Sequence, residues 1–591
     1  MPGSSVRIVS PATTQHPECS GQQKPDWASV WARVAPFAII FLASAALFFG
    51  ELGKYPLFNP DEALYAEPAR EMLEIGDYIT TYLNYAIRFT KPPIAIWGQA
   101  LGILAFGCNE FAVRFFGAAS GALLVAASYW FTERILGRRA AIVASSALAT
   151  APLFIGTARE AITDMPLSLF SACGMFCFYL AARARMPRMI YAAYICTGLA
   201  VMTKGPVGVV LPVAILSIYH VLRQDWKEAL KFYKPIQGLA IVALIALPWF
   251  ALEIWITRGA YFNDFIMREN FQRFTSVVDS HKGAWWYHIA ALMGGYFPWS
   301  VFIPQALFAA LMSNKIRDYW KNSGPFSILH SYRQLTAAED LGLYCAVWTI
   351  VTVSFFSLSV SKLLPYTLPA FPAVAVLIAL EMERIIESRS LKRSVLPAAC
   401  LTVSFAAATL IVPLTIDKLR DAPATLSTVI QSFASFELIF AAAAMAIVSR
   451  KYFRTAFFLF FLPTFVGFLF FGSRILGILS STWEEPLPTM ARFAACSDLP
   501  ILVYDMRKPS MPFYTRRQVI QPSSEEQLLA TLKTSKGAYI LSKSKRSDYF
   551  RHVPGCHIQM AEGKFILVQY RPPIETKSAT HTESASRRES P

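Results

Sequence analysis

The sequence predicts a polytopic α-helical membrane protein of about 13 spans, followed by a small α/β domain. Hydrophobic residues make up 54% of the 591 residues and charged residues only 16%, which leaves too little polar surface for a water-soluble chain of this length. The apolar residues are gathered in runs of about 20, the length that a helix needs to cross a bilayer. A polar segment with short strand-like runs follows the last apolar run.

The N-terminal segment, residues 1–32, is polar and rich in Ser, Pro and Gln. We expect it to be disordered and cytoplasmic. The first apolar run covers 34–52, with Trp27 and Trp31 before it and Tyr55 after it. Aromatic residues are enriched at both membrane interfaces. No small-residue cleavage site follows the run, so it is expected to be an uncleaved signal anchor.

The segment 53–110 is the first outer loop and holds two amphipathic stretches, 61–75 and 92–106. The second begins with Pro-Pro and is apolar on most sides, so it could be a short span. Counting it as a span would put the basic loop 133–139 outside. A helix that lies in the interface instead keeps this loop inside, and we choose that reading.

Twelve further runs complete the transmembrane domain, which we place at residues 33–480. Every second connecting loop carries at least three Lys or Arg residues, which puts the N-terminus inside and the C-terminus outside. The net charge of +16 is spread over these loops rather than along one stripe, so nucleic-acid binding is not expected. The runs are 111–131, 140–157, 165–182, 189–202, 207–222, 236–256, 286–312, 341–358, 364–380, 395–416, 430–448 and 455–475.

Residues 481–572 are expected to form an α/β domain in the periplasm, and 573–591 a disordered tail. Ser523 and Glu526 have the spacing of a capping box for the helix. Cys496 and Cys556 could form a disulfide or be two free thiols. The expected elements are strands at 500–504 and 538–542, a helix at 523–534, and a hairpin at 558–570 that turns at Glu562-Gly563.

Charged residues at the outer ends of the spans are the candidates for chemistry. Asp61 and Glu62 open the first amphipathic stretch, and Lys91 precedes the second. Taken alone, the two acids suit a solvated, capped helix, and the lysine suits snorkelling at the interface. Asp164 lies at the outer end of a later span, where it could be a plain cap of the following helix. Lys204 lies in a charged break between two apolar runs on the outer side, where a plain turn would not need a lysine.

Arg273, in the loop 257–282, and Lys362, near Tyr366, complete the set. One topology places all of these residues on the same face, so together they are more informative than any one alone. Cations at an interface suit a phosphate group. Carboxylates beside them suit a general base or a metal ligand. The pattern indicates a membrane enzyme that handles a lipid-linked phosphate at the outer leaflet.

The same motifs, in this order and spacing, resemble the GT-C membrane glycosyltransferases of the family 39 type, which include lipid A aminoarabinose transferases and protein O-mannosyltransferases. The match runs over about 33–382, and the small outer domain resembles the aminoarabinose branch. The motifs are Pro60-Asp61-Glu62 with Tyr65-Ala66 and Arg70-Glu71-Met72, Lys91-Pro92-Pro93, Thr163-Asp164-Met165-Pro166, Thr203-Lys204-Gly205-Pro206, Asn270-Phe271-Gln272-Arg273-Phe274, and Lys362-Leu363 with Pro365-Tyr366 and Pro369.

The resemblance implies an inverting transfer of a sugar from a polyprenyl phosphate to a lipid A-like or other extracytoplasmic acceptor, in the bacterial inner membrane. Asp61 would be the base or would orient the acceptor, and positive charge would stabilise the phosphate that leaves. Glu62 and Asp164 would position the sugar or the acceptor. The remaining implied roles are phosphate binding by Lys91, Arg273, Lys204 and Lys362, and substrate positioning by Tyr65 and Tyr366.

One residue departs from the aminoarabinose pattern. These transferases commonly have an acidic residue before the loop lysine, which helps to hold a metal, whereas this chain has Thr90. We therefore assign no metal, and the sugar, the acceptor and the oligomeric state stay open.

Three other functions are weighed against this one. A protein O-mannosyltransferase would use the same site on Ser or Thr. A flippase for a lipid-linked sugar would need mid-bilayer charges and a repeat that relates two halves, and the sequence contains neither. A catalytically dead scaffold would lack the pair of Asp61 and Lys91, and both are present.

Overall fold

The computed structural model describes residues 27–89, 91–184, 186–272, 283–312, 332–388, 391–416, 424–449, 452–472, 474–475, 477–478 and 484–573. The expected disorder of 1–32 falls mostly on residues outside these ranges, as does that of the tail beyond residue 573. Thr90 and Arg273 also lie outside the described residues.

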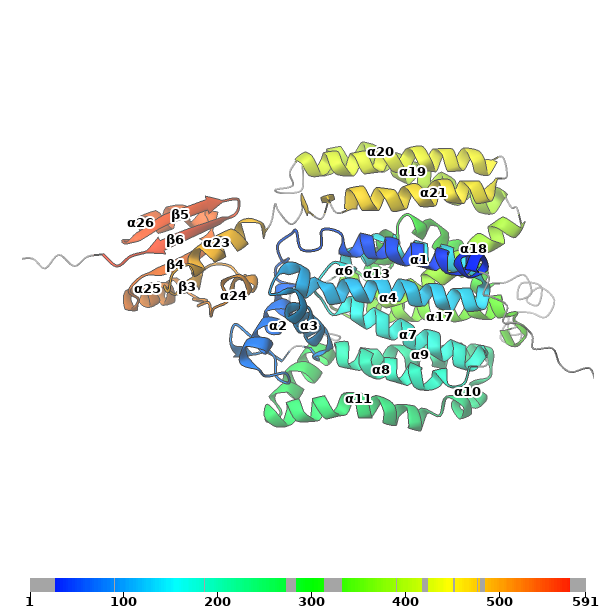
Figure 1. The fold of residues 1–591 in the computed structure, drawn as a ribbon, viewed down its shortest axis with the longest axis horizontal. Helices are drawn as coiled ribbons and strands as arrows, with labels where there is room; N and C mark the ends of the chain where they lie inside the picture. Colours follow the sequence, from blue (N-terminus) through cyan, green and yellow to red (C-terminus); the bar gives the residue numbers. More distant parts are fainter. Residues whose placement is uncertain are drawn as a thin grey trace, which may run out of the picture.

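The molecule has three parts (Figure 1): a large helical bundle, a separate unit of three helices beside it, and a small domain beyond one end of the bundle. The bundle contains α1 (Trp27–Phe49), α4 (Glu110–Leu136), α5 (Arg138–Ala149), α6 (Pro152–Ala158), α7 (Asp164–Arg183), α8 (Met189–Lys204), α9 (Val207–Arg223), α10 (Trp226–Tyr233), α11 (Pro235–Ile256), η1 (Phe262–Gln272), α13 (Tyr287–Gly295), η2 (Trp299–Phe302), α14 (Ile303–Leu311), η4 (Tyr332–Gln334), α17 (Ala337–Leu358), η5 (Leu364–Ala370) and α18 (Phe371–Ser388). The three-helix unit contains α19 (Leu391–Ile416), α20 (Ala424–Ser449) and α21 (Phe453–Gly467), with η6 (Phe468–Gly472).

The polytopic α-helical fold is confirmed, whereas the number of spans stays a prediction. Among the described residues, seven helices are long and apolar enough to cross a membrane, or eight if α5 and α6 form one bent span. The bend between these two is 66° and lies where Pro152 begins α6, because proline has no N–H for the preceding helix. The run predicted at 286–312 is likewise broken, into α13, η2 and α14.

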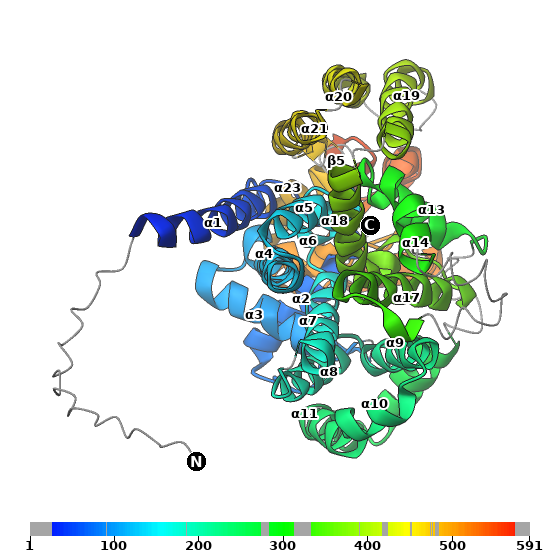
Figure 2. The same cartoon turned by 90° about the vertical axis from the view of Figure 1, so that its right-hand side faces the viewer.

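Burial separates the central helices from the peripheral ones. The side chains of α18 are buried over almost the whole helix, where small residues such as Ala373 and Ala379 allow close packing with α5 and α17. In contrast, α11 exposes large apolar side chains, including Leu244 and Leu247. Figure 2, which looks along the bundle, shows α18 inside it and α11 at its edge. A wide exposed apolar face of this kind is typical of a helix that contacts lipid.

The first outer loop folds into α2 (Ala63–Ile75), β1 (Tyr82–Leu83), β2 (Ala86–Ile87) and α3 (Ile94–Phe106). These elements lie between the bundle and the small domain (Figure 1). Leu101 and Leu104 of α3 are exposed, as expected for a helix that rests in an interface.

The small domain is a four-stranded sheet with helices, and the predicted α/β domain is thereby confirmed. The strand order is β3-β4-β6-β5, with β3 and β4 parallel and the other pairs antiparallel. The predicted hairpin is present, and Gly563 takes a positive φ of 55° in its turn. The elements are α23 (Pro486–Ala495), β3 (Ile501–Val503), α24 (Ser510–Thr515), α25 (Glu525–Thr534), β4 (Ala538–Lys543), η7 (Ser544–Arg546), α26 (Ser547–His552), β5 (Cys556–Glu562) and β6 (Phe565–Tyr570).

The structure specifies the N-cap of α25 and the state of two cysteines in this domain. The helix cap is Ser524, whose side chain accepts from the backbone N–H of Gln527, so the predicted capping box starting at Ser523 is wrong by one residue. Cys496 and Cys556 are both free thiols, so the second of the two alternatives holds.

The small domain is attached to the first outer loop through side chains on both sides. The backbone N–H of Leu57 donates to the hydroxyl of Tyr514 at 2.8 Å. Asn59 donates to Ser510 Oγ at 2.8 Å and accepts from its backbone N–H at 3.0 Å. Asn84 makes a similar pair of hydrogen bonds with the backbone of Val519. These bonds fix the chain on either side of α2, directly before Asp61 and shortly before Lys91.

Candidate functional site

Glu62 forms a buried ion pair that fixes the start of α2. Both of its carboxylate oxygens accept from Arg114 of α4 at 2.7 Å, in the bidentate geometry that guanidinium favours. The backbone N–H groups of Phe58 and Ala161 donate to the same carboxylate at 2.9 Å. With four donors and no exposure, Glu62 acts as a positioning residue that joins the first outer loop to α4 and to the end of α6.

Asp61 is the neighbour of Glu62 but is exposed to solvent. It lies close enough to Glu160, in the break between α6 and α7, to affect its titration. Burial raises the pKa of the Glu160 carboxyl to about 8, and repulsion from Glu62, Asp61 and Asp164 adds to the effect. Glu160 is therefore largely protonated at neutral pH, which leaves Asp61 as the exposed carboxylate of this cluster.

Asp164 and Lys204 form a second acid–base pair. Lys204 Nζ donates to Asp164 Oδ1 at 2.5 Å, where the first turn of α7 meets the last turn of α8. The same ammonium lies 4.7 Å from the ring centroid of Tyr366, within cation–π range. Three residues predicted from separate motifs are therefore in direct contact.

Tyr65 and Arg88 connect this pair to the first outer loop. The guanidinium of Arg88 donates to the carbonyl of Leu64 and lies over the ring of Tyr65. Burial raises the pKa of the Tyr65 hydroxyl, and the nearby Arg88 and Lys204 oppose that shift. Tyr65 thus lies between two cations that the sequence separates by more than 100 positions.

Lys91 pairs with Glu269 of η1, with Nζ 3.1 Å from Oε2, and its ammonium lies 5.9 Å from the centroid of the Phe265 ring. Burial lowers the pKa of Arg88, and its attraction to Tyr65 and Glu269 opposes this shift. Glu269 therefore lies within electrostatic range of both cations. Arg507 of the outer domain is also near enough to Arg88 to affect its pKa.

Lys362 is less closely linked to the others. Its ammonium donates to the carbonyl of Ser357 at 2.6 Å and to that of Phe356 at 3.4 Å, at the end of α17. A cation at a helix C-terminus satisfies carbonyls that have no partner within the helix. Tyr366, which Lys204 contacts, also stacks on His288 with ring centroids 6.1 Å apart, and Lys362 is an electrostatic neighbour of His288.

The predicted residues that the structure describes, which do not include Arg273, thus form one continuous series of contacts and electrostatic neighbours, with Lys362 at its edge. Sequence reasoning missed four members: Arg114, Arg88, Glu160 and Glu269. A signal existed for Arg114, because a charge inside an apolar run is costly without a partner. Among the described residues, no group of three or more His, Cys, Asp or Glu side chains is arranged to hold a metal ion.

Comparison with known proteins adds independent information. Residues 37–257 match the family model described as dolichyl-phosphate-mannose-protein mannosyltransferase. The crystal structure of ArnT from Cupriavidus metallidurans bound to undecaprenyl phosphate superposes with a TM-score of 0.76 at 22% identity, covering 91% of this chain and 98% of that one. The chain has the GT-C fold.

Curated relatives agree with this assignment. The undecaprenyl phosphate-alpha-4-amino-4-deoxy-L-arabinose arabinosyl transferases of Erwinia tasmaniensis and Enterobacter sp. (strain 638) are both 31% identical, covering 58% and 60% of this chain and 59% and 61% of the relatives. An uncharacterised protein of Aquifex aeolicus is 29% identical over 60% of this chain and 65% of its own length. The matches span about three-fifths of the relatives. The resemblance to the superfamily of lipid A aminoarabinose transferases and protein O-mannosyltransferases is confirmed, and the chain is a multi-pass inner-membrane protein.

Proposed function

We propose that the chain is an inverting glycosyltransferase that moves a sugar from a polyprenyl phosphate to a lipid A-like acceptor. In this proposal the N-terminus is cytoplasmic, and the site and the outer domain face the periplasm. The observation that carries it is one exposed carboxylate, Asp61, at the start of a helix fixed by the Glu62–Arg114 pair, at the end of the bundle that also holds the ion-paired cations Lys91 and Lys204. The relatives named for undecaprenyl phosphate substrates support the same donor class.

The roles follow from the charges. In the transfer, the bond between the sugar C1 and the phosphate oxygen breaks, and a bond from the acceptor oxygen to C1 forms on the opposite face. Polyprenyl phosphate leaves with the electron pair. Lys91, Lys204 and Arg88 lie where they can stabilise that negative charge. Asp61 orients the acceptor, and it accepts the proton where the acceptor is a hydroxyl group.

Several roles inferred from the sequence remain part of this proposal. Lys362 and Arg273 are assigned to the same phosphate, Lys362 from the edge of the site. Asp164 positions the sugar through its contact with Lys204, and Tyr65 and Tyr366 line the space between the cations. Glu62 is assigned a positioning role because its carboxylate is fully occupied by Arg114 and two backbone donors.

A second candidate is transfer to Ser or Thr of a protein, since residues 37–257 match a family model named for protein mannosylation. The two candidates differ only in the acceptor. To distinguish the two candidates, membranes that contain the full chain are supplied with labelled polyprenyl-phosphate sugars and with either lipid A or unfolded protein. The acceptor that becomes labelled identifies the reaction.

The test of the site uses Asp61→Asn in that assay. The matched control is Asp548→Asn of the outer domain, because Asp548 is exposed and forms an exposed ion pair with Arg551. We expect a loss of at least about 100-fold for Asp61→Asn, with normal membrane insertion, and full activity for the control. Full activity of Asp61→Asn would contradict the role. Movement of the intact donor across the bilayer without transfer would instead support a flippase.

A further inference from the structure

A second charged site lies at the end of the bundle opposite the outer domain. It is a groove of about 750 Å³ between the start of α8 and α10. Figure 1 shows α10 at the end of the helices away from the sheet domain, and Figure 2 shows α10 and α11 together at the edge of the bundle. Nothing in the proposed transfer reaction uses this groove.

The groove contains more positive than negative charge. Arg188, Lys231 and Lys234 line it together with one carboxylate, that of Glu228, which leaves two net positive charges. All four side chains are exposed. Among the described residues, none of the three cations has a carboxylate within ion-pair distance. Deeper at the same end, Arg183 is instead paired with Asp225 at 2.6 Å.

The position of Lys234 is also informative. Its backbone takes the left-handed conformation, with φ +49°, in the turn between α10 and α11. This conformation costs an L-residue with a Cβ about 1–2 kcal/mol and favours glycine or asparagine. A lysine there therefore places a long cationic side chain at the groove at some cost to the backbone.

The walls of the groove are aromatic, and its surroundings are apolar. Tyr191 and Phe232 line it. Beside it, Trp226 and Leu230 of α10 and Ile236 of α11 are about half exposed or more. Cations next to exposed tryptophan and aliphatic side chains are typical of a helix that lies in the headgroup region of a membrane.

The groove is held in place by buried contacts of α10. The hydroxyl of Tyr233 lies 2.9 Å from His220 Nε2 of α9. The backbone carbonyl of Tyr233 accepts from the hydroxyl of Tyr194 of α8 at 2.8 Å. Because α8 and α10 are tied together in this way, the cations on the two sides of the groove keep a fixed separation.

We propose that this groove binds the phosphodiester headgroup of an anionic phospholipid from the leaflet that faces α10. Arg188, Lys231 and Lys234 neutralise the phosphate, and Tyr191 and Phe232 contact the glycerol and the first acyl carbons. Glu228 accepts from a headgroup hydroxyl. A free phosphate ion would not use the apolar surround, so the lipid is the ligand that fits all of the walls. The same helix α8 carries Lys204 at its other end, about 24 Å away, so a lipid bound here stabilises the helix that positions that residue.

The test measures binding of phosphatidylglycerol and phosphatidylcholine to the purified full chain in detergent by native mass spectrometry. The variant is Lys231→Gln/Lys234→Gln. The matched control is Arg134→Gln/Arg139→Gln, which removes two exposed cations on either side of the α4–α5 connection; neither residue lines the groove between α8 and α10. Thermal unfolding of each variant verifies that the fold is intact, and Lys231→Arg/Lys234→Arg tests whether charge alone suffices.

We expect phosphatidylglycerol to bind more tightly than phosphatidylcholine and the lysine variant to weaken this binding about fivefold for each lysine removed. The control and the arginine variant should stay within about twofold of the parent. Equal losses in the lysine variant and the control would overturn the proposal in favour of general surface charge. Equal binding of the two lipids, or displacement of the lipid by millimolar inorganic phosphate, would overturn it as well.

Discussion

The two ends of the helical bundle both hold buried acid–base groups, but they are built differently. At the end near α10, Asp340 accepts from the hydroxyls of Tyr219 and Tyr179 and pairs with Arg183 and Arg223. At the end near the sheet domain, Lys91 pairs with Glu269 at 3.1 Å and Lys204 pairs with Asp164 at 2.5 Å. The carboxylate of Asp340 joins α7, α9 and α17 through four side chains, whereas each of these two pairs joins two segments of the chain.

The same contrast appears in the titration of the acids. At the inner end, burial alone would raise the pKa of Asp225, but hydrogen bonds from His220 and Arg183 lower it to about 2. At the outer end, burial and neighbouring acids raise the pKa of Glu160 to about 8. The inner network therefore fixes its charges, and the outer cluster keeps a proton that can be lost near physiological pH. The network around Asp340 and Asp225 joins helices, whereas the cluster around Glu160 can exchange a proton during a reaction.

The first prediction removes Asp340 from its network. Asp340→Ala leaves the part-buried Arg183 and Arg223 with Asp225 as their remaining carboxylate and removes the acceptor of the Tyr219 hydroxyl, so we expect a loss of about 1–3 kcal/mol in the free energy of unfolding. Thermal or denaturant unfolding in detergent measures the loss. The fraction that remains folded should transfer sugar at a normal rate, and a rate loss without a stability loss would contradict the assignment of this network as structural.

The second prediction removes a cation from the site. Lys91→Gln removes the charge that faces Glu269 and, in the proposed reaction, the leaving phosphate. We expect the transfer rate per folded protein to fall about 10²–10³-fold and, because the pair with Glu269 is largely buried, the free energy of unfolding to fall by about 1–3 kcal/mol. Lys227→Gln, at the exposed surface of α10, is the control and should leave the rate unchanged. If Lys91→Gln transferred sugar at the rate of the unmodified protein, the role of Lys91 in binding the phosphate would be contradicted.

The third prediction concerns the proton on Glu160. Its folded pKa of about 8 lies above the ordinary value of 4.5, so the folded chain binds the proton more tightly than the unfolded chain. Stability is therefore fully present below about pH 4.5 and is lost as the pH rises through 8. Glu160→Gln should weaken this dependence in unfolding experiments between pH 5 and pH 9. Burial raises the pKa of Glu67 to about 8 as well, so Glu67 contributes to the same pH dependence. The variant Glu67→Gln is therefore measured in parallel to separate the two contributions.

The smallest expected effect is on how the transfer rate depends on pH. Ionised Glu160 would add a negative charge beside Asp61 and Asp164 and so weaken the binding of an anionic acceptor. We expect the transfer rate to decline by a few fold, on the order of the effect of one unscreened charge, between pH 7 and pH 9. In Glu160→Gln this decline should be absent. An identical profile in both proteins would show that another group controls it.

The sequence predicts much of the fold, because hydropathy and loop charge are local properties. The spans, the α/β domain and its hairpin follow from short windows of sequence. Breaks inside spans are harder to predict, since the bend between α5 and α6 depends on how Pro152 packs as well as on its presence. The exact number of spans stays a prediction for the same reason.

The sequence predicts which residues belong to the candidate site but not which of them contact one another. Asp164, Lys204 and Tyr366 come from three separate motifs, and the structure brings them into contact. The partner of Glu62 lies 52 positions away in a helix, and nothing local in the sequence specifies that distance. Lys362 shows another limit, because a lysine at the end of a span can cap carbonyls as well as bind phosphate, and the local sequence does not specify its contacts with the carbonyls of Ser357 and Phe356.

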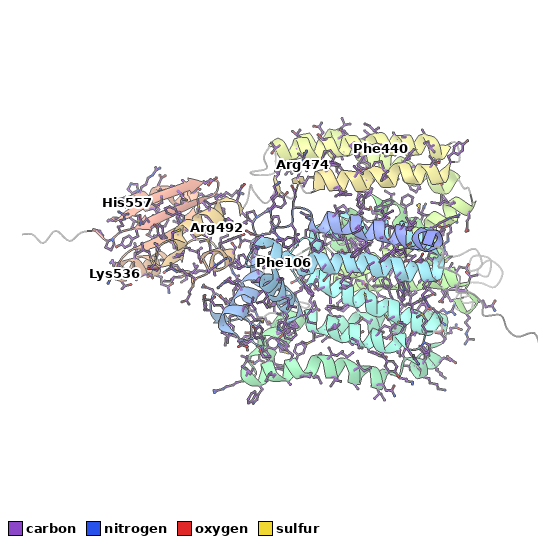
Figure 3. All side chains as sticks on the ribbon, in the orientation of Figure 1. Phe106, Phe440, Arg474, Arg492, Lys536 and His557 are labelled. Carbon is purple, nitrogen blue, oxygen red and sulfur yellow. The ribbon has the colours of Figure 1, made fainter. Side chains whose placement is uncertain are left out.

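The attachment of the outer domain has a consequence for how the protein is made. Figure 3 shows that domain, with Lys536 and His557 labelled, beyond the loop region near Phe106. Asn59 and Asn84 of the early loop hydrogen-bond to Ser510 and Val519, which the ribosome adds more than 400 residues later. The loop that carries Asp61 therefore makes these contacts only when the C-terminal domain has been synthesised and folded. A chain truncated before this domain would lack the hydrogen bonds of Asn59 and Asn84 to it. We therefore expect activity to depend on synthesis of the C-terminal domain.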